Sequence, residues 1–232
     1  MGTLYIVSTP IGNLEDISYR AVKILSQVDF IACEDTRHTG SLLSRIAQIE
    51  NSSKPRLISY YEQNELQRIP EIINLLKNDK NIALVSDAGT PAISDPGFKL
   101  IRECIREGIR VESIPGASSV ITALTSSGLP TDKFTFAGYP PRKPGHRKTF
   151  FENIKKSQES LKTTVILFEA PHKIVKTLTE MQEVFGDIEV VLARELTKMH
   201  EEVRREKISV CLDSFKKKKL RGEFVILLNL SA

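Results

Sequence analysis

The chain has 232 residues, of which 41% are hydrophobic and 27% are charged. This composition excludes a disordered chain, and no apolar run approaches the ~20 residues that a membrane-spanning helix needs. The net charge is +4, with −2 on residues 1–116 and +6 on residues 117–232. A basic half beside a mildly acidic half indicates a polyanionic partner, although a solvated basic surface explains the charge equally well.

The cysteines and the N-terminus bear on the compartment. Three scattered cysteines without a CxxC pair make no disulfide framework, which favours a reducing compartment. The first residues enter a strand-like run without the basic and apolar regions of a signal peptide, so we expect a cytoplasmic protein. The four histidines are isolated and lack metal-ligand spacing, so we expect no metal centre.

Strands and helices alternate through the first half of the chain. Short runs rich in Ile and Val predict five strands, at 4–8, 28–33, 57–60, 82–86 and 110–114. Apolar residues at helical spacing predict helices between them, over 17–28, 69–76 and 98–105. This alternation is typical of a largely parallel sheet with helices on both sides.

The second half has a different rhythm. Its pattern predicts helices over 118–127, 147–156 and 172–185, and strands at 134–138, 164–168, 190–194, near 206–211 and at 224–230. The last strands lack helices of adequate length between them, which predicts an antiparallel pair. We therefore expect two α/β domains, residues 1–116 and 117–232.

Three loops that contain Gly and Pro follow predicted strands, at 9–13, 86–97 and 114–119. Ligands of open α/β sheets bind beyond the carboxyl ends of the strands, and glycine there permits close backbone approach to an anion. One such loop is ordinary turn chemistry, but three at equivalent positions favour a binding site. The sequence contains neither a GxxxxGK[ST] nor a GxGxxG motif, which argues against a P-loop NTPase or a standard dinucleotide-binding fold.

Charged residues also follow the strands. Asp35 and Arg37 come after one buried strand, and Glu195 and Lys198 come after another. Such groups can supply a general base and electrostatic positioning, or they can pair with one another as structural ion pairs. The sequence leaves both interpretations open.

A basic, proline-rich segment spans residues 140–148. It holds three prolines and, with its histidine, five positive groups in nine positions, which predicts a stiff exposed loop. Its arginines and lysines suit phosphate groups, and the candidate RNA contacts are Arg142, Lys143, Arg147 and Lys148. A second basic run, 216–219 with Arg221, is interpreted as a solvated face.

Together these segments resemble the tetrapyrrole-methylase superfamily, and within it the branch that methylates ribosomal RNA. The blocks that carry the resemblance are STPIGNL (8–14), CEDTRH (33–38), SDAGTP (86–91), IPG (114–116), FAGYP (136–140), FEAPH (168–172), RELTK (194–198) and GEF (222–224). They cover essentially the whole chain in order. Tyr139 and Phe168 depart slightly from the usual residues of this branch.

The resemblance implies two α/β domains with S-adenosylmethionine (SAM) in the cleft between them, and a homodimer. It also implies 2′-O-methylation of a cytidine in 16S rRNA of the small ribosomal subunit. Asp35, Arg37, Glu195 and Lys198 would act at the methyl-transfer end, and which of them is a base stays open. The implied cofactor-binding residues are Pro10, Gly12, Asp87, Ala88, Gly89, Ile93, Gly116, Ala117, Ser118, Leu167, Glu169, Ala170, Ala193 and Arg194.

Two other functions compete with this one. A small-molecule methyltransferase for porphyrinogens or precorrins shares the superfamily, and because a porphyrinogen is a polycarboxylate the basic charge does not exclude it. A ribosome-assembly factor could bind RNA without catalysis, but the intact glycine loops argue against it.

Overall fold

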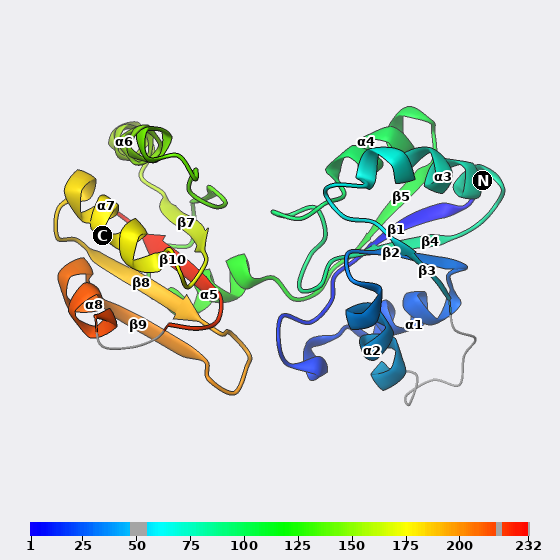
Figure 1. Ribbon diagram of the computed structural model, residues 1–232, viewed down its shortest axis with the longest axis horizontal. Coiled ribbons are helices and arrows are strands. Elements are labelled where there is room, and N and C mark those ends of the chain that lie inside the picture. Colours follow the sequence, from blue (N-terminus) through cyan, green and yellow to red (C-terminus); the bar gives the residue numbers. More distant parts are fainter. Residues whose placement is uncertain (47–54, 217–219, 232) are drawn as a thin grey trace. The chain divides into compact units, whose positions relative to one another are not determined.

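The computed structural model describes residues 1–46, 55–216 and 220–231 (Figure 1). Residues 217–219 of the second basic run lie outside the described residues. The chain divides into two compact units, Met1–Ser118 and Ser119–Ala232. Both units are α/β, each built on its own five-stranded sheet.

The sheet of the first unit has the order β3-β2-β4-β1-β5, and every pairing in it is parallel. The strands are β1 (Thr3–Val7), β2 (Phe30–Cys33), β3 (Arg56–Ser59), β4 (Ile82–Val85) and β5 (Arg110–Ile114). The predicted parallel sheet is confirmed. Because the strands run the same way, all five carboxyl ends meet at one edge.

Helices cover both faces of this sheet, as predicted (Figure 1). They are α1 (Tyr19–Gln27), α2 (Thr36–Ile46), α3 (Glu65–Lys77) and α4 (Phe98–Arg106), with a short 3-10 turn, η1 (Leu14–Asp16). Alternate residues of β1 separate the two apolar layers: Leu4 and Ile6 pack toward α3 and α4, and Val7 packs toward α1 and α2. Because successive side chains of a strand point to opposite faces, this sheet has an apolar core on each side.

The sheet of the second unit has the order β6-β7-β10-β8-β9. Its strands are β6 (Phe134–Phe136), β7 (Thr164–Glu169), β8 (Glu189–Arg194), β9 (Glu202–Lys207) and β10 (Phe224–Leu228). Only β6 and β7 pair in parallel, and the predicted antiparallel pair is confirmed as β8 with β9.

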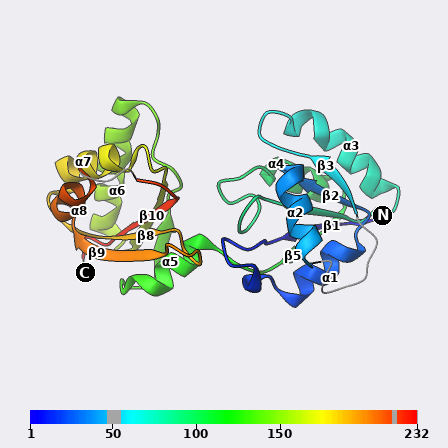
Figure 2. The ribbon, with the colours of Figure 1, turned by 60° about the horizontal axis from the view of Figure 1, so that its bottom comes forward.

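Helices cover this second sheet too (Figure 2). They are α5 (Ser119–Ser127), α6 (Pro144–Ser160), α7 (Ile174–Phe185) and α8 (Ile208–Phe215). The main core lies between the sheet and α6, α7 and α8, where Phe151, Leu178 and Phe215 are buried. The strands that carry the loops of this unit are therefore anchored in a well-packed core.

Two sequence predictions for the second unit need correction. The strand predicted near 206–211 lies earlier, as β9, which ends at Lys207, and the buried Ile208, Cys211 and Phe215 recur at helical spacing in α8. The segment 140–148 is not wholly a loop, because α6 begins at Pro144. Proline is tolerated there, since the first N–H of a helix has no partner within the helix.

No helix of the described residues is long and apolar enough to cross a membrane. Over the same residues, no group of three or more His, Cys, Asp or Glu side chains is placed to hold a metal ion.

Candidate active site

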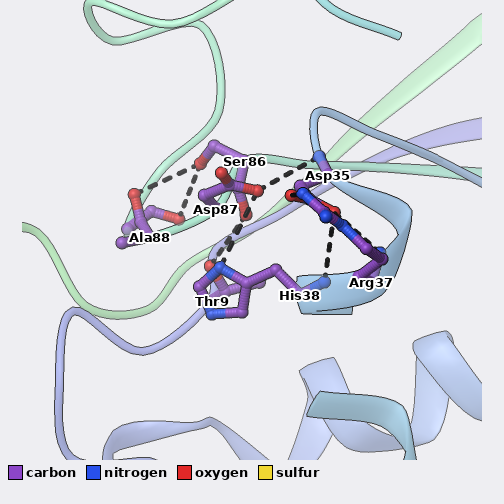
Figure 3. A network of polar contacts seen from close by, with 8 residues as sticks. Thr9, Asp35, Arg37, His38, Ser86, Asp87 and Ala88 are labelled. Carbon is purple, nitrogen blue, oxygen red and sulfur yellow. Dashed lines mark hydrogen bonds and ion pairs between the residues drawn. The ribbon is translucent and has the colours of Figure 1, made fainter. Parts of the chain in front are cut away.

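The loops after β1 and β4 are joined at the carboxyl edge of the first sheet (Figure 3). The backbone N–H of Thr9 donates to the carbonyl of Gly89 at 2.9 Å, and the N–H of Gly89 donates back at 3.1 Å. The Thr9 hydroxyl also donates to the carbonyl of Ser86, at 3.3 Å. Gly89 has φ = +79°, a conformation that other residues adopt only with strain.

The loop after β5 joins the same edge. The Thr90 hydroxyl donates to the carbonyl of Ala117 at 3.2 Å and lies 3.0 Å from the Ser8 hydroxyl. Gly116 packs so closely that a Cβ there would lie 2.9 Å from the Cβ of Ser8. The three glycine loops named from the sequence therefore lie together at one edge of the first unit.

Several backbone donors at this edge are free. Within the described chain, no hydrogen bond uses the N–H groups of Ala88, Gly116, Ala117 or Ser118. Adjacent unpaired N–H groups are suited to an anion such as a carboxylate.

The loop after β4 is strained beyond its glycines. Ala92 and Ser94 have φ = +69° and +62°, and Ile93 between them is 46% exposed. A left-handed alanine or serine costs roughly 1–3 kcal/mol and is retained where the surroundings require it. Strain of this kind is concentrated at ligand-binding sites, which agrees with the place of Ile93 in the candidate cofactor set.

Asp35 and Arg37 pair with each other at the start of α2. Arg37 Nη2 lies 2.7 Å from Asp35 Oδ2, and Asp35 Oδ1 accepts from the Arg37 side chain at 3.1 Å and from its backbone N–H at 2.8 Å. These hydrogen bonds hold the pKa of Asp35 well below its usual range. Asp35 is therefore a poor proton acceptor, although its charge and that of Arg37 can orient a substrate.

Glu34 is a functional candidate that the sequence analysis missed. Burial, together with the nearby carboxylates of Asp95 and Asp87, raises its pKa to about 7, against the opposing effect of the Asp87 N–H. A carboxyl group with a pKa near neutrality at a strand edge is typical of general acids and bases. Its position as the first residue after the buried strand β2 was the available signal.

In the second unit, Glu195 and Lys198 also form a pair. Lys198 Nζ lies 3.1 Å from Glu195 Oε1 and 3.3 Å from Glu223 Oε2. Burial opposes the shift, but the hydrogen bonds from Lys198 and from the Glu223 N–H lower the pKa of Glu195. Glu195 and Thr197 are left-handed, with φ = +50° and +63°, so this turn is strained as well.

The cofactor candidates of the second unit are largely enclosed. Leu167 and Ala193 are fully buried, backbone included, so they can support a ligand site from beneath but present no exposed group to a ligand. Arg194 lies over the Phe224 ring at 5.9 Å, and its Nη1 is 3.3 Å from Glu202 Oε2. Its buried Nε has no hydrogen-bond partner in the described chain.

The basic segment needs one correction. Arg142, Lys143 and Lys148 are exposed, as a phosphate contact requires. Arg147 is only 2% exposed and lies in α6, with Glu180 Oε2 2.5 Å from its Nε. Its guanidinium therefore faces the protein interior, and we remove it from the candidate RNA contacts.

The family model of the tetrapyrrole (corrin/porphyrin) methylases matches residues 3–210. The chain belongs to the tetrapyrrole methylase family. The match confirms the resemblance carried by the strand-end blocks.

Curated members of the family are similar over nearly the full length. Ribosomal RNA small subunit methyltransferase I of Thermotoga maritima is 46% identical, with 99% of each chain covered. The protein of the same name from Hydrogenobaculum sp. is 48% identical, over 97% of this chain and 95% of that one.

Two solved structures share the fold. A cobalt precorrin-4 methyltransferase has a TM-score of 0.70 at 21% identity, with 97% of this chain and 93% of that chain covered. A diphthine synthase has a TM-score of 0.71 at 17% identity, over 98% and 90% of the two chains. These likenesses confirm the predicted fold class.

Proposed function

We propose that the protein is a SAM-dependent RNA methyltransferase that methylates the 2′-hydroxyl of a cytidine in 16S rRNA of the small ribosomal subunit. The observation that carries this proposal is the 46% identity, over 99% of both chains, to a ribosomal RNA small subunit methyltransferase I. The choice of ribose and cytidine rests on the motif resemblance.

The residues at the first sheet edge fit SAM, which supplies a methyl group on a positively charged sulfur. The free N–H groups around Gly116 suit its carboxylate, and the strained segment around Ile93 offers an apolar contact. We assign cofactor binding in this unit to Pro10, Gly12, Asp87, Ala88, Gly89, Ile93, Gly116, Ala117 and Ser118. In the second unit we assign it to Leu167, Glu169, Ala170, Ala193 and Arg194, with the half-buried Ala170 at the turn after β7 as the most accessible backbone.

The chain's own part in the reaction is positioning and proton removal. Orientation of two reactants can supply on the order of 7–11 kcal/mol of the barrier. The ribose hydroxyl must lose its proton as it attacks, and Glu34 is better suited than Asp35 to accept it because its pKa is close to neutrality. Arg37, Glu195 and Lys198 provide fixed charges around the reacting groups.

The pair of Glu195 and Lys198 can be tested through Gly222. A Cβ at Gly222 would lie 2.5 Å from Cγ and Cδ of Glu195, so Gly222→Ala must displace that side chain. We expect methyl transfer to fall at least tenfold. The matched control is Gly186→Ala, which has a similar φ of +82° but open space around it, and it should stay within twofold of wild type. Equal activity of the two variants would show that the position of Glu195 is unimportant.

The exposed basic side chains Arg142, Lys143 and Lys148 are proposed to contact RNA phosphates. Replacing all three with alanine should weaken RNA binding. It should also reduce the magnitude of the slope of log K against log[salt] by roughly two to three. SAM affinity should not change. The control replaces the exposed Lys133, Lys156 and Lys162, which alters the net charge equally. If both triple variants show the same slope, the RNA site lies elsewhere.

Finer properties complete the proposal. We propose a homodimer, supported by the family resemblance, with a mass of twice 26.0 kDa in sedimentation equilibrium. We also propose a cytoplasmic location, which three buried free cysteines support.

The function is tested by substrate competition. Labelled SAM is offered with unmodified 30S subunits, free 16S rRNA or uroporphyrinogen. Label in either RNA sample supports the proposal. Label in uroporphyrinogen alone would make the protein a tetrapyrrole methyltransferase, and RNA binding without label would make it an assembly factor.

A further inference from the structure

The second unit contains a buried network of ionic side chains whose role the mechanism above does not explain. The side chains of Arg147 and Glu169 are only 3% and 2% exposed, and Arg147 Nη1 lies 3.8 Å from Glu169 Oε2. Arg147 Nε also lies 2.5 Å from Glu180 Oε2. Its Nη2 donates at 2.6 Å to the hydroxyl of Thr177, which in turn donates to Glu169. Four side chains from α6, β7 and α7 are thereby connected.

One branch of this network reaches the basic segment. Arg147 Nη1 donates to the backbone carbonyl of Pro141 at 3.2 Å. Pro141 directly precedes Arg142 and Lys143, two of the proposed phosphate contacts. A hydrogen bond from a buried guanidinium holds the backbone at the base of these two side chains.

The other branch reaches the turn after β7. Glu169 Oε2 accepts from Thr177, while Glu169 Oε1 accepts from the N–H of Ala170 at 2.9 Å. The backbone of Glu169 and Ala170 is part of the proposed cofactor site. The carboxylate of Glu169 is thus committed to the network and fixes this turn from inside the protein.

Stability is a weak explanation for such a network. Taking charges out of water costs about as much as their attraction returns, and well-packed apolar residues often do as well or better. A planar guanidinium with five donors does, however, fix several acceptors in one geometry, which lysine cannot do. The three directions used by Arg147 join segments that the proposed function assigns to two different ligands.

We propose that Arg147 is a positioning residue, which holds the 140–143 segment for RNA phosphates and the Glu169–Ala170 turn for the cofactor without touching either ligand. This inference rests on the proposed function. It predicts that a buried arginine in contact with neither ligand controls the affinity for both.

The test measures binding of S-adenosylhomocysteine (SAH) by calorimetry, and of unmodified 16S rRNA by fluorescence anisotropy. Arg147→Lys keeps the positive charge but loses the planar guanidinium donors that reach several acceptors at once. Both affinities should therefore fall at least fivefold. Lys148→Ala, the exposed neighbour, should weaken RNA binding and leave SAH binding within twofold. Thr177→Val removes only the hydroxyl that links Arg147 to Glu169, so it should weaken SAH binding at least threefold with little effect on RNA.

The other outcomes would overturn the inference. Unchanged affinities of Arg147→Lys with a lowered melting temperature would make the network purely structural. Loss of RNA binding alone would make Arg147 a phosphate contact like Lys148. If Arg147→Lys does not fold, the well-packed Thr177→Val decides, and unchanged SAH binding there would overturn the inference. Wild-type protein that bound neither SAH nor RNA would instead overturn the proposed function.

Discussion

Replacing Gly89 with valine should abolish measurable SAM binding and, with it, methyl transfer. Gly89 has φ = +79°, and a Cβ there would lie 3.2 Å from Ile11 Cγ2, before either methyl of valine is added. A β-branched residue at positive φ is an outlier that costs roughly 1–3 kcal/mol. The substitution must therefore shift the loop that Gly89 ties to Thr9, along with the neighbouring free N–H of Ala88. Calorimetry on the folded variant should show no measurable SAM binding.

The control separates this effect from backbone strain. Gly108 in the same unit has φ = +69°, and a Cβ there would meet nothing within 4 Å. Gly108→Val should lose comparable stability but keep SAM affinity within twofold. If Gly89→Val also binds SAM normally, the loop after β4 is not part of the cofactor site.

Replacing Glu34 with glutamine should stabilise the protein at pH 8 and have little effect at pH 4. The pKa of Glu34 is raised from 4.5 to about 7 by burial and by the carboxylates of Asp95 and Asp87. The folded protein therefore holds the proton more tightly than the unfolded chain does. The free energy of unfolding contributed by Glu34 is fully present below pH 4.5 and is lost as the pH rises through 7.

The size of the pKa change sets how much the stability of Glu34→Gln should differ from that of wild type. A rise in pKa from 4.5 to about 7 corresponds to roughly 3 kcal/mol, which solvent screening of the partly exposed side chain reduces to roughly 1–3 kcal/mol. Urea unfolding should show that the free energy of unfolding of Glu34→Gln exceeds that of wild type at pH 8. This excess should be larger at pH 8 than at pH 4 by the same amount, roughly 1–3 kcal/mol. Glu15→Gln, at an exposed position, should show no such growth. A constant difference for Glu34→Gln would mean that Glu34 is ionised normally, and its role as proton acceptor would fail.

Much of the first unit could be predicted from the sequence because the central strands of its sheet are buried on both faces. Such strands appear as continuous Ile- and Val-rich runs, and the predicted strand at 82–86 matches β4, whose four residues are all buried. The carboxyl ends of parallel strands meet by topology, so the sequence alone assigns the loops containing Thr9, Gly89 and Gly116 to one site.

The second unit was harder because charge and proline were misleading there. A basic segment with three prolines indicated an exposed loop, but Pro144 occupies the first position of α6, where proline is tolerated. Arg147, three residues later, faces inward because Glu169 and Glu180 lie on neighbouring elements. Such partners are distant in the sequence, so a burial of this kind is decided by tertiary packing.

The pKa of Glu34 is likewise decided by tertiary packing. Glu34 and Asp35 differ in the sequence only by one position after β2, yet the carboxyl of Glu34 is half-buried near other acids and that of Asp35 is paired with Arg37. Their pKa values move in opposite directions. Which carboxyl can accept a proton thus depends on burial and on neighbouring charges, which the local sequence does not reveal.

The central claim is that the methyl group goes to a ribose of 16S rRNA. The most direct measurement treats unmodified 30S subunits with the protein and SAM, digests the 16S rRNA to nucleosides and identifies the methylated product by mass spectrometry. We predict one new product, 2′-O-methylcytidine, absent when Gly89→Val replaces the wild-type protein. A base-methylated nucleoside, or no new methylated nucleoside in the rRNA, would contradict the claim.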